Sequence, residues 1–206
     1  YRFSLHHSVT WRAEVAEVHS NWWYQHRRQF FLEDVVLIGP AGAEWGDWLR
    51  LLKREQKAPA ERQEAGGKAL RVARSFSADM TERENQLARM LALQWRRQRE
   101  DKTLASPQRC YWQGSESAWQ AFAGEVKNSF PEMELPEFPE MWMGESTLSD
   151  IAAFLGSDDN DAHILVAGCQ SVLASAEGLL PAGEAAALWL AGSEGPVLLS
   201  RGEFFS

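Results

Sequence analysis

Short continuous apolar runs alternate with longer amphipathic stretches along this chain of 206 residues. Residues 35–38 and 163–167 form such runs, which are typical of strands covered on both faces of a sheet. Residues 45–55 differ, because their Trp and Leu side chains recur at the spacing of one helical face. The pattern therefore predicts strands and helices in alternation.

Polar residues that can cap a helix stand before the other amphipathic stretches. Thr81 is followed three residues later by Glu84, which is the spacing of a capping box. The other predicted helix starts are Ser115 or Ser117, and Thr147. Residues 57–68 have the composition of an exposed loop.

Strands and helices in this order predict an α/β fold, with a mixed, mostly parallel sheet and helices on both faces. The size of the chain and its apolar content are enough for one hydrophobic core. We expect an aromatic-rich N-terminal extension at residues 1–34 and an α/β domain at residues 35–206.

Charge is distributed unevenly and argues against nucleic-acid binding. Residues 49–109 hold 15 Lys and Arg against 8 Asp and Glu, whereas residues 110–206 hold 2 against 15. The basic side chains in the first region alternate with Glu and Gln, as on solvated helix faces, and the acidic second region would repel phosphate. We therefore expect no nucleic acid among the partners.

The two cysteines and the hydropathy pattern argue against metal-binding, redox and membrane-spanning proteins. Cys110 and Cys169 lack the spacing of a zinc or redox motif, so we expect buried thiols, no metal site and a reducing compartment. No run approaches the ~20 apolar residues that a membrane span needs. We therefore expect a cytoplasmic location, with a possible tether in a segment preceding Tyr1.

Residues 162–191 carry the most specific motif, AHILVAGCQSVLASAEGLLPAGEAAALWLA. A strand, a small-residue turn and a PAGEAAA stretch that leads into a second strand resemble the middle of thiolase-like enzymes, in particular β-ketoacyl synthases. The resemblance implies that residues 35–206 form one half of a thiolase-like fold, a mixed five-stranded sheet with helices. Residues 144–155 would then stand for the nucleophile helix.

The family's chemistry needs a cysteine at the start of that helix, where the dipole and backbone N–H groups activate it. The matching positions are Glu145, Ser146 and Thr147, while Cys169 follows the next strand. The family's second-half histidines have no counterpart before Ser206. We therefore expect no catalytic residues and no cofactor. The missing nucleophile favours a protein that is not an enzyme.

Two functions stay open. The first is a non-catalytic protein-interaction module on a degenerate thiolase-like fold, an adaptor or accessory protein similar to those of bacterial type VI secretion. Its partner would be a secretion component or effector. Its expected contact residues are large aromatic side chains: Trp22, Trp23, Tyr24, Trp45, Trp48, Phe138 and Trp142.

The alternative is a subunit of an acyl-condensing, ketosynthase-like enzyme that a second thiolase-like subunit completes. A tunnel along residues 144–149, wide enough for an acyl chain, would favour this alternative. Bulky side chains that fill this space would favour the interaction module, and the candidates are Trp142, Met143 and Phe154.

Overall fold

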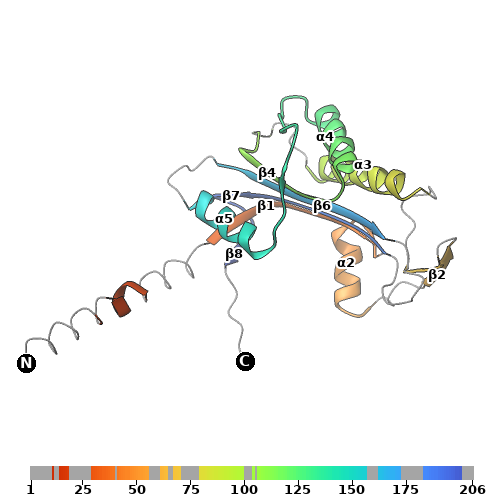
Figure 1. Cartoon of the computed structure of the whole chain (residues 1–206). Coiled ribbons are helices and arrows are strands. Elements are labelled where there is room, and N and C mark those ends of the chain that lie inside the picture. Colours follow the sequence, from red (N-terminus) through yellow and green to blue (C-terminus); the bar gives the residue numbers. More distant parts are fainter. Residues whose placement is uncertain are drawn as a thin grey trace, which may run out of the picture.

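The computed structural model describes an α/β protein with one six-stranded mixed sheet and a separate two-stranded hairpin (Figure 1). The residues it describes are 11, 14–18, 29–39, 41–55, 61–64, 67–70, 79–99, 104, 106–156, 162–172 and 183–200. Of residues 61–64 and 67–70 it describes the backbone. The predicted contact residues Trp22, Trp23 and Tyr24 lie outside the described part of the chain.

The six-stranded sheet has the strand order β5-β4-β6-β7-β1-β8. Its strands are β1 (Gln29–Ile38), β4 (Arg109–Gln113), β5 (Glu140–Met141), β6 (Ile164–Val172), β7 (Gly183–Gly192) and β8 (Val197–Ser200). The described helices with defined bounds are α2 (Trp45–Leu52), α3 (Met80–Gln98), α4 (Glu116–Ser129) and α5 (Glu145–Leu155).

The sheet is mixed, as expected, but the prediction of a mostly parallel sheet was wrong. β4 pairs in parallel with β5 and β6, whereas the β6–β7, β7–β1 and β1–β8 pairs are antiparallel. The prediction assumed a helical crossover between successive strands. Only residues 173–182 join β6 to β7, fewer than the dozen or more that a parallel crossover needs.

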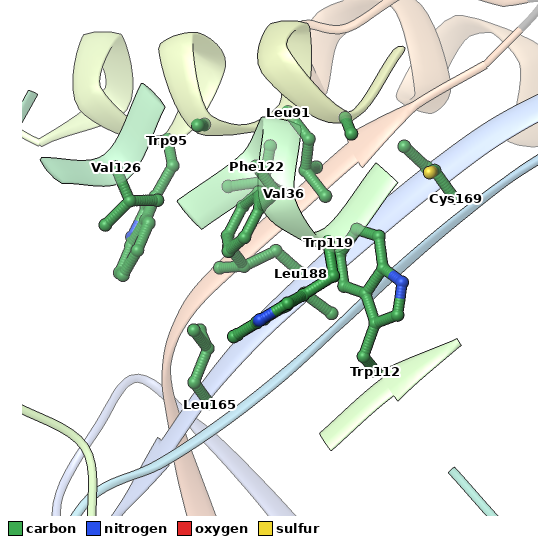
Figure 2. Close-up of a cluster of buried hydrophobic side chains, with 14 of the residues drawn as sticks. Val36, Leu91, Trp95, Trp112, Trp119, Phe122, Val126, Leu165, Cys169 and Leu188 are labelled. Atoms are coloured by element: carbon green, nitrogen blue, oxygen red, sulfur yellow. The ribbon is translucent and has the colours of Figure 1, made fainter. Parts of the chain in front are cut away.

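Helices cover both faces of the sheet, as the sequence predicted. In Figure 1, α3 and α4 lie above the sheet, while α5 and α2 lie below it. The upper layer holds the larger core, in which Trp95, Trp119 and Phe122 are at most 1% exposed (Figure 2). The smaller core below centres on Ile151 of α5.

Because of an irregularity in β1, even-numbered side chains of this one strand pack into both cores. The register against β7 shifts between Leu32 and Asp34. Phe30 and Leu32 therefore pack with α5, whereas Val36 and Ile38 pack with the α3 side, although all four have even numbers. An extra residue in one strand reverses the alternation of its side chains.

β1 begins at Gln29, so the boundary that we predicted between residues 34 and 35 falls within this strand. The apolar run at residues 35–38 is only the C-terminal part of β1. Phe30 and Leu32, which we assigned to the extension, belong to the core below the sheet.

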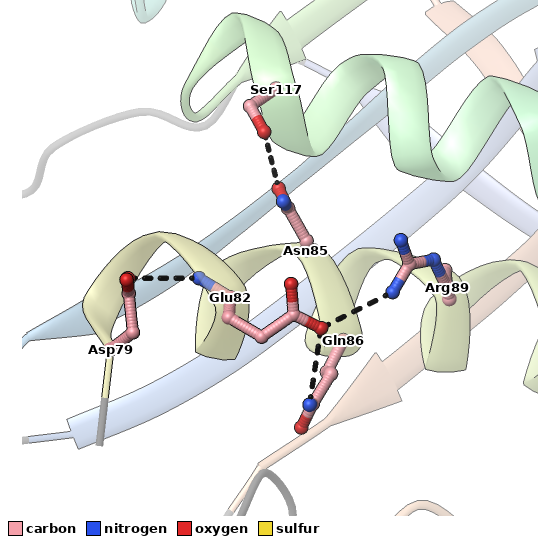
Figure 3. Close-up of polar contacts among 6 residues, drawn as sticks. All are labelled: Asp79, Glu82, Asn85, Gln86, Arg89 and Ser117. Carbon is pink, nitrogen blue, oxygen red and sulfur yellow. Dashed lines mark hydrogen bonds and ion pairs between the residues drawn. The ribbon is translucent and has the colours of Figure 1, made fainter. Parts of the chain in front are cut away.

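Local polar contacts set where the helices begin. α3 starts after Asp79, not Thr81, because the Asp79 carboxylate accepts hydrogen bonds from the backbone N–H groups of Thr81 and Glu82 (Figure 3). Ser115 caps α4, as predicted. α5 starts at Glu145, two residues before the predicted Thr147 cap.

Side-chain contacts also join α3 to its neighbour α4. The Ser117 hydroxyl of α4 donates to the side-chain oxygen of Asn85 on α3, 2.9 Å away (Figure 3). Within residues 57–68, where we expected a loop, the chain forms most of the antiparallel hairpin of β2 (Glu61–Glu64) and β3 (Gly67–Leu70). The loop prediction was therefore wrong for the residues of these two strands.

Gly195 gives a test of how closely β8 is tied to β1. A Cβ atom at Gly195 would lie 2.4 Å from the backbone oxygen of Leu32. We expect Gly195→Ala to lower the free energy of unfolding by about 1–3 kcal/mol, because backbone must shift to admit the methyl group. Chemical denaturation of both proteins measures the difference.

The matched control is Gly124→Ala within α4, where an added Cβ meets nothing within 4 Å. This change should raise stability by about 0.5–1 kcal/mol, since alanine favours helix. Equal effects of the two substitutions would contradict the packing described for Gly195.

Candidate functional site

The start of α5 is where the resemblance places a nucleophile, and its hydroxyl groups are bound to nearby backbone. The Thr147 hydroxyl accepts a hydrogen bond from the Met143 N–H at 2.8 Å, and the Ser146 hydroxyl donates to the Met143 carbonyl at 3.2 Å. Thr147 is buried and Ser146 is exposed. Both contacts tie the first turn of α5 to Met143, the residue before its Gly144 N-cap, so these hydroxyls hold local backbone.

Neither cysteine has the surroundings of a reactive thiol. Cys110 and Cys169 are both buried on the α3 side of the sheet. Burial raises the pKa of Cys110 to about 12. Burial likewise raises the pKa of Cys169 above its ordinary value, and the nearby Glu84 charge adds to this rise. At neutral pH both groups are therefore neutral thiols, whereas nucleophilic chemistry needs a thiolate.

We therefore expect both thiols to resist a water-soluble disulfide reagent in the native protein. At pH 8, a thiol with a pKa of about 12 is ionised to only about one part in ten thousand. Labelling followed by absorbance should be slow in buffer and complete within minutes in guanidinium chloride. Rapid labelling of one equivalent in the native state would contradict the burial and favour a catalytic thiol.

An apolar groove of about 330 Å³ is lined by strands of the sheet, by Trp48 of α2 and by Trp142, which precedes α5. Its floor comes from neighbouring strands, where Gly168 of β6 is paired with Ala187 of β7, which is paired in turn with Leu37 of β1. Alternation along β6 places Gly168 on the same face as Ile164 and Val166, which pack with α5. The groove therefore belongs to the lower face of the sheet.

Tryptophan side chains form the walls of this groove. Trp48 of α2 stands at one side and is half-buried, and a Cβ atom at Gly39 would lie 2.9 Å from its ring. Trp142 and Trp189 stand at the other side, with ring centroids 5.8 Å apart in an edge-to-face arrangement. Small floor residues between large aromatic walls give a hollow that suits an apolar side chain.

The structure brings only part of the predicted contact set together. Trp48 and Trp142 both line the groove. Trp45 is 67% exposed on α2, and Phe138 is 64% exposed on the connection between α4 and β5. The sequence analysis missed Trp189, and the signal that could have found it is the alternation in the strand that follows PAGEAAA, where Ala187 and Ala191 flank Trp189 on the same face.

A buried ion pair lies near the N-terminal end of β7, on the side of the sheet that α3 covers. The Arg83 guanidinium donates to the Glu184 carboxylate at 3.0 Å, and the two residues are 6% and 4% exposed. The Ser171 hydroxyl donates to the same carboxylate oxygen at 3.4 Å. These contacts join α3 to β7 and β6, so the pair stabilises the packing of the upper layer.

Searches for a metal site and a membrane span among the described residues, and for related proteins, give no further indication of function. Among the described residues, no group of three or more His, Cys, Asp or Glu side chains is placed to hold a metal ion. None of the helices in the described part is long and apolar enough to cross a membrane. No protein-family model matches the chain, and a search of curated proteins finds no relative.

Proposed function

We propose that this chain is a non-catalytic protein-interaction module, an adaptor or accessory protein built on a degenerate half of a thiolase-like fold. The observation that carries the proposal is the apolar groove walled by Trp48, Trp142 and Trp189. Large aromatic side chains around a hollow are the usual anchors of a protein interface.

The start of α5 supports the non-catalytic part of the proposal. Its first turn holds no thiol, and its hydroxyls at Ser146 and Thr147 are hydrogen-bonded to the backbone of Met143. The bulky Trp142 lines the groove, whereas residues 144–149 contribute nothing to its lining. This arrangement agrees better with the interaction module than with an acyl tunnel along residues 144–149.

The topology supports the thiolase-like part. Under the resemblance, residues 35–39 at the end of β1 stand for the family's first strand and its glycine-bearing turn, and residues 144–155, which stand for the nucleophile helix, contain α5. α5 directly precedes β6, which pairs with β7, the strand that follows PAGEAAA. All of these elements belong to one mixed sheet and the helices on it, although this sheet has six strands and not the five that the resemblance implies.

The test of the proposed function is affinity purification of the tagged full chain from its native cells, with mass spectrometry of proteins recovered in stoichiometric amount. We expect a secretion component or effector in the bacterial cytoplasm, with type VI secretion as the setting. Recovery should fall at least tenfold in Ala187→Trp, which fills the groove. A partner recovered equally by wild type and Ala187→Trp would contradict docking at this groove.

The groove also keeps the second function open, because about 330 Å³ of apolar space could take part of an acyl chain. In that case the chain would be a subunit of an acyl-condensing enzyme completed by a partner chain. Incubation with a medium-chain acyl thioester and intact-mass measurement separates the two functions. The interaction module predicts no covalent adduct, whereas an adduct lost in Ser146→Ala would favour the enzyme subunit.

A further inference from the structure

The lining of the apolar groove carries no charged side chain. None of the described residues that line it is Asp, Glu, Lys, Arg or His, although Asp, Glu, Lys and Arg make up 24% of the chain. A charged group that entered the groove would lose hydration and meet no opposite charge there. The lining is therefore complementary to an uncharged ligand and disfavours phosphates, carboxylates and basic side chains.

Two glutamine side chains give this apolar lining its hydrogen-bonding groups. Gln113, at the end of β4, is paired with Gly168 of β6, and Gln170 lies two residues further along β6. Paired residues, and residues two apart in a strand, share one face of a sheet. Both glutamines line the groove and are exposed. Their amides can therefore donate to and accept from a ligand in the groove.

Flat indole rings stand on opposite sides of these amides. Trp142 and Trp189 lie nearly perpendicular to one another, at 87°, and Trp48 stands on the other side. Trp45, three residues before Trp48 on α2, is 67% exposed, so the aromatic surface continues along one face of this helix. Aromatic-lined grooves of this kind suit the flat, rigid rings of proline.

We infer that the groove binds a proline-rich segment of the partner protein in the polyproline II conformation. The inference rests on the proposed function and names the chemistry of its partner. A polyproline II backbone has no internal hydrogen bonds, so its carbonyl groups can accept from the amides of Gln113 and Gln170. Because the segment is already extended before it binds, it loses little conformational entropy.

The two amides favour this occupant over other uncharged ones. A helix bonds its backbone groups internally and could offer the groove only side chains. An acyl chain has no polar group along its length for either amide. An added strand needs a free sheet edge, whereas β6 and β7 are inner strands of the sheet. A proline-rich segment uses the indole rings and the amides together.

A defined probe tests the inference without the natural partner. The probe is a fluorescently labelled peptide of Pro and Gln, compared with a peptide of the same length in which Ala replaces every Pro. Fluorescence anisotropy against the full chain gives the two affinities. We expect the Pro peptide to bind at least tenfold more tightly. Its affinity should change less than twofold between low and physiological salt, because the contact pairs no charges.

A first set of variants tests the hydrogen-bonding groups. Gln113→Leu/Gln170→Leu keeps side chains of similar size without the amides, and should weaken binding of the Pro peptide about tenfold. Gln120→Leu is the control, because Gln120 is exposed on α4, on the other face of the sheet, and should change binding less than twofold. Binding that is unchanged or tighter in the double variant would overturn the inference.

A second set tests the apolar space. Ala185→Trp places a large ring at an exposed position of the lining and should abolish binding of the Pro peptide. Ala153→Trp adds the same ring to an exposed position of α5 outside the lining and should leave binding unchanged. Circular dichroism checks that both proteins fold. Should Ala185→Trp not fold, the glutamine variants decide the question alone.

Equal binding of the Pro and Ala peptides, or equal losses in Ala185→Trp and Ala153→Trp, would also overturn the inference. So would a dimer in sedimentation velocity that Ala185→Trp dissociates, because a second copy of this chain would then occupy the groove. None of these outcomes decides the proposed function, which the affinity purification tests separately with Ala187→Trp.

Discussion

Replacing Trp119 by alanine is expected to lower the free energy of unfolding by about 3–5 kcal/mol, because it removes a large buried ring from the upper core. Trp119 is 1% exposed, and its ring centroid lies 5.5 Å from that of Trp112 and 5.8 Å from that of Phe122. Its indole N–H also donates to the Glu137 carbonyl at 3.1 Å. Truncation leaves both a cavity and an unbonded carbonyl.

Urea denaturation followed by circular dichroism measures this loss. The control is Trp45→Ala, which removes the same side chain from a position that is 67% exposed and should cost less than about 0.5 kcal/mol. Trp119→Phe keeps an aromatic ring but loses the hydrogen bond to the Glu137 carbonyl, and its loss of stability should fall between the two. A Trp119→Ala protein as stable as Trp45→Ala would contradict the packing of α4.

The second large effect is expected from the buried pair of Arg83 and Glu184. Arg83→Met removes the guanidinium and leaves a carboxylate that is 4% exposed without this partner, which should cost about 3–5 kcal/mol. Arg89→Met is the matched control, because Arg89 pairs with Glu82 at the surface and should cost less than about 1 kcal/mol.

A double-mutant cycle shows whether the pair is the reason for the loss. Arg83→Met/Glu184→Gln should be more stable than the sum of the single losses predicts, since no buried charge is then left without its partner. Strictly additive losses would mean that the two side chains stabilise the protein through separate contacts.

The strands at the groove were predictable because each contains a run of consecutive apolar residues. β6 and β7 carry the two apolar segments on either side of Pro181, and their presence is confirmed. Ser115 was predictable as a helix cap because its hydroxyl needs only the backbone three residues later. These features depend on short stretches of sequence.

The features that the sequence could not reveal depend on contacts between distant segments. The shift in β1 at Leu32 and Asp34 reverses which face each side chain takes, and no local pattern marks it. The groove depends on α5 covering one end of a sheet face and Trp48 standing at the other. Trp22, Trp23 and Tyr24 lie outside the described residues, so their role stays a prediction.

Site-specific photo-crosslinking in native cells tests most directly whether the lower face of the sheet is a protein-docking surface. A benzophenone amino acid replaces Trp45, which is exposed on α2 one turn before the groove residue Trp48, and in a second protein replaces Leu93 on α3. The account predicts one discrete protein adduct from position 45, identified by mass spectrometry, and none from position 93. An adduct from position 93 alone, or an acyl carrier protein crosslinked at position 45, would contradict it.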